Sequence, residues 1–107
     1  MKILFDQGTP APLRRWLARH EISTAYEMNW SNLENGTLLN SAEQHGFNLL
    51  ITTDQNLTYQ QNLKLRVIAI IALPTTNWPR IRKNVDSVMA AVSQVTPGTY
   101  IKLRFPD

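Results

Sequence analysis

Hydrophobic runs alternate with amphipathic segments along the whole chain. The short β-branched and aliphatic runs predict five strands, at Lys2 to Phe5, Ile22 to Tyr26, Asn48 to Thr53, Arg66 to Leu73, and Gly98 to Phe105. The fourth run is apolar without interruption, which is typical of a strand buried on both faces. The fifth alternates between polar and apolar residues, as an edge strand does.

Between these runs, apolar residues recur at helical spacing. The predicted helices are Pro10 to Arg19, Asn35 to His45, a short one near Leu57 to Leu63, and a long one capped by Asn77. Thr9 is the expected N-cap of the first helix, and Gly46 the left-handed residue that ends the second. One face of the long helix carries Ile81, Val85, Val88, Met89 and Val92.

The order of these elements predicts an α/β fold with a single domain over residues 1–107. Strands that alternate with helices form a mostly parallel sheet, because right-handed crossovers place the helices on both of its faces. We expect a three-layer sandwich whose five-stranded sheet has the order 2-1-3-4-5. In such a sheet, ligands bind at the carboxyl ends of the strands, beside the point where the winding reverses.

Composition narrows the class of protein. With 107 residues, 43% of them hydrophobic and 18% charged, the chain is an ordinary folded protein. The sequence has no cysteine, which excludes a disulfide scaffold and a thiolate metal site. We find no apolar run near the roughly 20 residues of a membrane span and no signal-peptide pattern, so a cytoplasmic protein without a membrane partner is expected. A net charge of +3 permits an anionic partner.

An Asp-Gln pair follows both the first and the third predicted strand, at Asp6 and Asp54. Adjacent strands lie about 4.8 Å apart, so two carboxylates there repel each other unless a cation lies between them. Magnesium suits this place, because it takes one or two carboxylates and keeps several waters. The alternative is that each aspartate caps the helix that follows it.

Other polar residues follow the strands at the same edge of the sheet. Arg80, Arg82 and Lys83 fall near the start of the long helix, where the helix dipole disfavours cations, so phosphate binding is one explanation for them. An exposed, salt-screened basic patch is the other. Gln55 opens an amide-rich stretch that suits phosphate and sugar oxygens, and equally suits a solvated short helix.

Two long stretches, "KILFDQGTPAPLRRWL" and "TAYEMNWSNLENGTLLNSAEQHGFNLLITTDQNLTYQQNL", resemble the small uncharacterised PIN-like proteins. These are related to PIN-domain ribonucleases and to the C-terminal Mut7 domain. The resemblance implies a doubly wound α/β sandwich and a nuclease that depends on magnesium or manganese. Some members of the family are toxins that occur beside small antitoxins, so an antitoxin-like protein is an expected partner.

Carried over by position, Asp6 and Asp54 match the first and third acidic sites of that family. Two other acidic positions are replaced here, by Thr37 and Asn56. An amide oxygen binds magnesium without adding charge, so we expect Asn56 to be a metal ligand and Thr37 to contact substrate. Glu34 could supply a missing charge, but Ser31 to Glu34 also has the pattern of a capping box, which we favour.

The expected function is therefore metal-dependent cleavage of nucleic acid, with RNA as the expected substrate and DNA still open. The alternative is a degenerate PIN-like module that binds nucleic acid or a protein partner without cleaving. A receiver-like phosphoryl-transfer domain is a third hypothesis, but the paired acids and the lysine it needs are missing. The edge strand Thr99 to Phe105 is a plausible contact for a homodimer.

Overall fold

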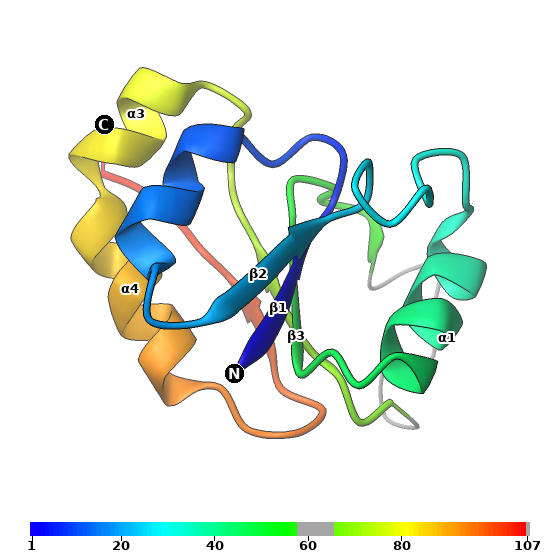
Figure 1. The fold of residues 1–107 in the computed structure, drawn as a ribbon. Helices are drawn as coiled ribbons and strands as arrows, with labels where there is room; N and C mark the ends of the chain where they lie inside the picture. Colours follow the sequence, from blue (N-terminus) through cyan, green and yellow to red (C-terminus); the bar gives the residue numbers. More distant parts are fainter. Residues whose placement is uncertain (58–65, 107) are drawn as a thin grey trace.

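A computed structural model describes residues 1–57 and 66–106 of the chain. It has a five-stranded sheet in the order β2-β1-β3-β4-β5 (Figure 1). The strands are β1 (Lys2–Phe5), β2 (Glu21–Thr24), β3 (Leu49–Thr52), β4 (Ala69–Ala72) and β5 (Tyr100–Lys102). All four pairings are parallel, so the predicted order is confirmed and the sheet is wholly rather than mostly parallel.

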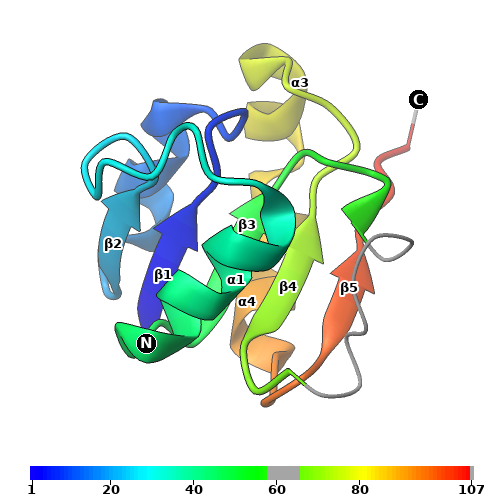
Figure 2. The ribbon, with the colours of Figure 1, turned by 90° about the vertical axis from the view of Figure 1, so that its right-hand side faces the viewer.

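Helices cover both faces of this sheet. They are the 3₁₀ helix η1 (Ala11–Leu17) and the α-helices α1 (Asn35–Gln44), α3 (Trp78–Lys83) and α4 (Val85–Gln94). Figure 1 shows η1, α3 and α4 on one side of the strands and α1 on the other, and Figure 2 shows α1 lying across the front of the sheet. The predicted three-layer sandwich is confirmed. Apart from Leu57, the predicted helix near Leu57 to Leu63 lies outside the described residues.

Two hydrophobic cores lie on the two faces of the sheet because side chains alternate along each strand. Phe5 and Ile51 point toward the η1, α3 and α4 layer, whereas Leu4 and Leu50 point toward α1. Every residue of β3 and β4 is buried, as unbroken apolar runs predict. Within the described residues, no helix is both long enough and apolar enough to cross a membrane.

The first helix differs from the prediction. It is a 3₁₀ helix whose N-cap is Pro10 and which has no side-chain cap, so the prediction that Thr9 caps it is wrong. The Thr9 hydroxyl instead donates a 2.8 Å hydrogen bond to the Ile51 carbonyl of β3. Pro10 and Pro12 fix their φ angles and carry no N–H to donate, which favours a short, tight helix here.

The predicted long helix is two helices, because α3 ends at Asn84 and α4 begins after it. The Asn84 side chain donates a 2.9 Å hydrogen bond to the Arg80 carbonyl and so competes with the helical ladder. The predicted cap is confirmed, since the Asn77 side chain accepts from the Arg80 N–H at 3.0 Å. Met89 was expected on the buried face but is 41% exposed, because the buried stripe of α4 runs through Val85 and Val88.

The start and end of α1 also test the sequence patterns. Gly46 follows this helix with a φ of +79°, as predicted for its terminating residue. The predicted capping box needs Ser31 as the N-cap, but Glu34 occupies that position and its side chain makes no capping hydrogen bond, so this prediction is wrong.

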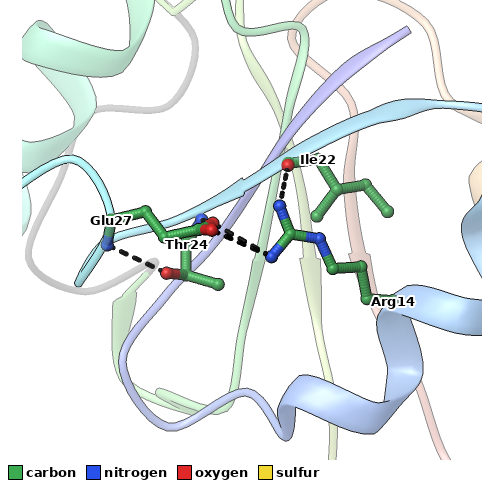
Figure 3. A network of polar contacts seen from close by, with 4 residues as sticks. All are labelled: Arg14, Ile22, Thr24 and Glu27. Atoms are coloured by element: carbon green, nitrogen blue, oxygen red, sulfur yellow. Dashed lines mark hydrogen bonds and ion pairs between the residues drawn. The ribbon is translucent and has the colours of Figure 1, made fainter.

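The outer edge of β2 is occupied by side chains from the chain itself (Figure 3). Arg14 donates to the Ile22 carbonyl and forms a 3.1 Å ion pair with Glu27. Glu27 accepts a 2.9 Å hydrogen bond from the Thr24 N–H, and the Thr24 carbonyl accepts one of 3.1 Å from the Met28 N–H. The hydrogen bond from Arg14, followed by that from Thr24, lowers the pKa of Glu27. Three outward-facing backbone groups of β2 are thus hydrogen-bonded within the chain.

Candidate functional site

The two aspartates lie at the carboxyl edge of the sheet, on neighbouring strands. Asp6 directly follows β1, and Asp54 follows β3 after one intervening residue. Strands β1 and β3 pair with each other, and the Asp6 N–H donates a 2.9 Å hydrogen bond to the Ile51 carbonyl. Both side chains are partly exposed. This is the reversal point of a doubly wound sheet, where such folds bind their ligands.

A single buried hydroxyl connects the two aspartates. The Thr52 hydroxyl donates a 2.7 Å hydrogen bond to Asp6 Oδ2 and accepts one of 3.0 Å from the Asp54 N–H. Thr52 is fully buried at the end of β3. Thr52 was not among the predicted site residues, although a threonine that ends an apolar run two residues before an aspartate was the available signal.

The other partners of the carboxylates are neutral donors. Asp6 Oδ1 accepts a 2.7 Å hydrogen bond from the Gln7 N–H. Asp54 Oδ1 accepts one of 2.9 Å from the Asn56 N–H, and Asp54 Oδ2 one of 2.8 Å from the Asn35 side-chain amide. Each carboxylate oxygen has two lone pairs, so these bonds leave acceptor capacity for a further ligand.

Helix capping, the alternative role for the aspartates, has a different outcome for each of them. Asp6 does not cap η1, whose N-cap is Pro10. The backbone carbonyl of Asp6 accepts a hydrogen bond from the Thr9 N–H in a turn. Asp54 bonds the N–H two residues ahead, which is an Asx turn, a common way to begin a helix. Capping therefore fails as an explanation for Asp6 and remains open for Asp54.

Helix α1, on the other face of the sheet from η1, contributes a residue that was not predicted to belong to the site. Asn35 is the first residue of α1 and bonds Asp54, whereas Thr37, the expected substrate contact, is exposed in the first turn. Residues two apart on a helix do not face the same way, which separates the roles of Asn35 and Thr37. Matching by position to PIN-like proteins had indicated Thr37, and not Asn35, as the place of an acidic side chain in the site.

The two amide residues after Asp54 serve the loop that holds it. Gln55 donates from its side chain to the Leu73 carbonyl just after β4 and so fastens this loop across the sheet edge. Asn56 is exposed and contacts Asp54 through its backbone N–H. The described contacts give both residues structural roles; their predicted roles toward substrate and metal stay predictions.

The basic residues of α3 lie at this edge, but the reason given for them was wrong. Since α3 ends at Lys83, the cations Arg80, Arg82 and Lys83 fall in its last turn, where the helix dipole favours them. The guanidinium of Arg82 lies 5.3 Å from the centre of the Trp16 ring. The surface hollows that contain these cations are lined by neither Asp6 nor Asp54.

The chemistry available at this edge is that of two carboxylates and neutral amides. Among residues 1–57 and 66–106, no group of three His, Cys, Asp or Glu side chains gathers as a metal centre. No protein-family model matches the chain, and neither a curated protein nor a solved structure matches it. The fold and the site therefore define a doubly wound α/β protein with an acidic pair at its switch point.

Proposed function

We propose that Asp6 and Asp54 hold a divalent magnesium or manganese ion in a PIN-like nuclease that cleaves RNA. The observation that carries this proposal is the Thr52 hydroxyl, which is hydrogen-bonded to the side chain of one aspartate and to the backbone of the other. This hydroxyl fixes the Asp6 carboxylate and the backbone of Asp54 at neighbouring strand ends. Two carboxylates at such positions repel each other, and a cation between them would relieve that repulsion.

The donor set fits such an ion. Magnesium prefers carboxylate and carbonyl oxygens and retains water in its remaining positions. When bound between two carboxylates, it makes water a better nucleophile and stabilises the oxygen that leaves a phosphodiester. Thr52 orients the Asp6 carboxylate and Asn35 orients that of Asp54. Asn35 donates a neutral hydrogen bond to Asp54, and Thr37 and Asn56 add no charge where the family has acids, so weak metal affinity is expected.

Further parts of the proposal rest on the resemblance. A PIN-like toxin would act in the cytoplasm and would bind a small antitoxin-like protein. Its homodimer would form through the edge strand β5, which is shorter than the predicted Gly98 to Phe105. Each of these parts is separable from the metal site and from the nuclease activity.

A second function is a PIN-like module that binds nucleic acid without cleaving it. The observation that favours it is that the hydrogen-bond partners of the two carboxylates named above are all neutral donors, so each aspartate has partners in the absence of a metal ion. The exposed Thr37 and Asn56, which replace two acidic residues of the family, point the same way.

Metal binding and cleavage separate the two functions. Manganese titrated into labelled protein should broaden the nuclear magnetic resonance signals of Asp6 and Asp54 first, and less so in Asp54→Asn. Single-stranded RNA should be cleaved slowly in millimolar magnesium or manganese, faster by Thr37→Glu, and not at all by Asp54→Asn. Equal background cleavage by all three proteins, with metal or with chelator, would refute the nuclease and leave the binding module.

A further inference from the structure

A groove between η1 and α3 combines an exposed and a half-buried tryptophan ring with arginines. It is lined by Pro12, Arg15, Trp16, Trp78 and Arg82 and has a volume of about 370 Å³. A second hollow of about 910 Å³ shares Pro12, Arg15 and Trp78 and continues along η1 to β2. Together they form one continuous surface, called the η1–α3 groove below. No Asp or Glu is among the residues that line either hollow.

Two of the three arginines that line the groove have no ion-pair partner within the described part of the chain. Arg15 and Arg82 are exposed, and neither forms an ion pair with a described carboxylate. Arg14 differs, because it lines the same surface but is engaged by Glu27 and by the Ile22 carbonyl (Figure 3). Two cations are therefore available to an anionic ligand, and the third serves as an internal comparison.

The aromatic side chains supply flat apolar surface beside these charges. Trp16 is 37% exposed, although most residues of its size and apolarity are buried in this protein. Arg82 lies over one face of its ring, 5.3 Å from the ring centre, which holds a guanidinium against the exposed aromatic side chain. Trp78 packs partly against the core and still lines both hollows. Tryptophan faces that adjoin arginines are typical of sites that stack bases and bind phosphates.

The groove also begins at the edge that carries the aspartates. Both of its helices start there, η1 after the Asp6 loop and α3 after β4. Gly8 of the Asp6 loop lies next to the segment before α3, since a Cβ on it would be in ordinary van der Waals contact with Thr76 at 3.9 Å. The end of the groove where both helices start is therefore the end nearer the Asp6 loop.

We propose that the η1–α3 groove binds single-stranded nucleic acid, with bases on Trp16 and Trp78 and phosphates on Arg15 and Arg82. The inference deepens the proposed function and rests on it for the direction of the strand, whereas binding in the groove needs no metal. A flexible single strand fits because its bases are free to stack and its phosphates repeat along it.

The test is binding without cleavage. A fluorescently labelled oligouridine is titrated in chelator with the wild type, with Arg15→Glu/Arg82→Glu, and with the control Lys102→Glu/Arg104→Glu, whose exposed residues lie at and beyond β5. Both double variants change the net charge equally. The groove variant should bind at least tenfold more weakly than the wild type, whereas the control should bind as the wild type does.

Two further measurements strengthen this test. Trp16→Ala should weaken binding about tenfold. The salt dependence of log Kd in the groove variant should be shallower by about 1.4, as expected for two lost phosphate contacts to a single strand. Circular dichroism and thermal melting of each variant identify any that fail to fold, and the surface arginine variants decide the matter if Trp16→Ala does not fold.

The outcomes distinguish this inference from the proposed function. Equal weakening by the groove and control variants would overturn the groove, whatever the nuclease assay shows. Tighter binding of an acidic peptide or of duplex RNA than of the oligouridine would overturn it as well. Binding lost only in the groove variant would support it even if no variant cleaves RNA.

Discussion

The Thr52 hydroxyl offers the sharpest test of the acidic pair, because it can be removed with little change of shape. In Thr52→Val a methyl group replaces the hydroxyl at a fully buried position. Asp6 then loses a 2.7 Å hydrogen bond, and the Asp54 N–H loses its 3.0 Å acceptor. Thr52→Ser keeps both bonds and removes only a methyl group, so it is the matched control.

The expected energies differ enough to be measured. A hydrogen bond to a charged group contributes about 1.5–3 kcal/mol, and a buried N–H left without an acceptor costs about 1–3 kcal/mol. Since the site is partly exposed, we expect Thr52→Val to lower the free energy of unfolding by about 2–4 kcal/mol. Removing a buried methyl group costs about 1 kcal/mol, which is the loss expected of Thr52→Ser.

Urea denaturation in chelator measures both variants without any contribution from metal. The midpoint should fall further for Thr52→Val than for Thr52→Ser, with an unchanged slope. In an Asp6→Asn background the two variants should come closer together, as a double-mutant cycle reports for residues in contact. If Thr52→Val is as stable as Thr52→Ser, the hydroxyl does not hold the aspartates and the argument for a shared metal site loses its main support.

Three further predictions concern other contacts. Asn35→Asp sets a carboxylate against Asp54 in place of a donor 2.8 Å away, so the melting temperature in chelator should fall by about 10 °C and recover in millimolar magnesium. Gly98→Ala should lower the free energy of unfolding by about 1–3 kcal/mol in urea, since φ is +76° and the new Cβ would lie 2.9 Å from the Arg66 carbonyl oxygen. Burial acts to raise the pKa of Glu43. The hydrogen bonds that Glu43 accepts, first of all the one from Arg66, outweigh this effect and lower the pKa from 4.5. Stability from Glu43 is therefore present above pH 4.5 and lost as pH falls below it, and Glu43→Gln should flatten the acid limb of a denaturation profile.

Each of these has its own control. Gly46→Ala, with a φ of +79° and open space around the new Cβ, should be milder than Gly98→Ala, and an equal loss would show that the close approach is unimportant. Asp86→Asn, on the exposed side of α4, should leave the acid limb unchanged. A magnesium response no larger in Asn35→Asp than in the wild type would count against a cation beside Asp54.

The sheet was predictable because apolar runs and their order dictate it. Buried parallel strands such as β3 and β4 need apolar residues on both faces, and that requirement is visible in the sequence. The strand order then placed Asp6 and Asp54 on adjacent strands. These are local patterns combined with a general rule of handedness, so no knowledge of side-chain contacts was needed.

The partners of the aspartates were not predictable in the same way. Thr52 meets Asp6 because of the register between β1 and β3, and periodicity does not determine a register to a single residue. The start of α1 at Asn35 was predicted correctly, but the helical pattern does not show that the Asn35 side chain bonds Asp54. The break at Asn84 coincides with a side-chain hydrogen bond to the Arg80 carbonyl, and it reversed the electrostatic explanation for the cations of α3.

The occupied edge of β2 has a consequence for aggregation. Fibres grow when a sheet can add a neighbour at each of its two edges, so that every added copy presents a fresh edge to the next. Here Arg14 and Glu27 already bond the outward groups of β2. Two copies joined edge to edge through β5 would therefore present an occupied β2 edge at each outer side. Strand addition would stop at a pair, and breaking the Arg14 to Glu27 contact would remove that limit.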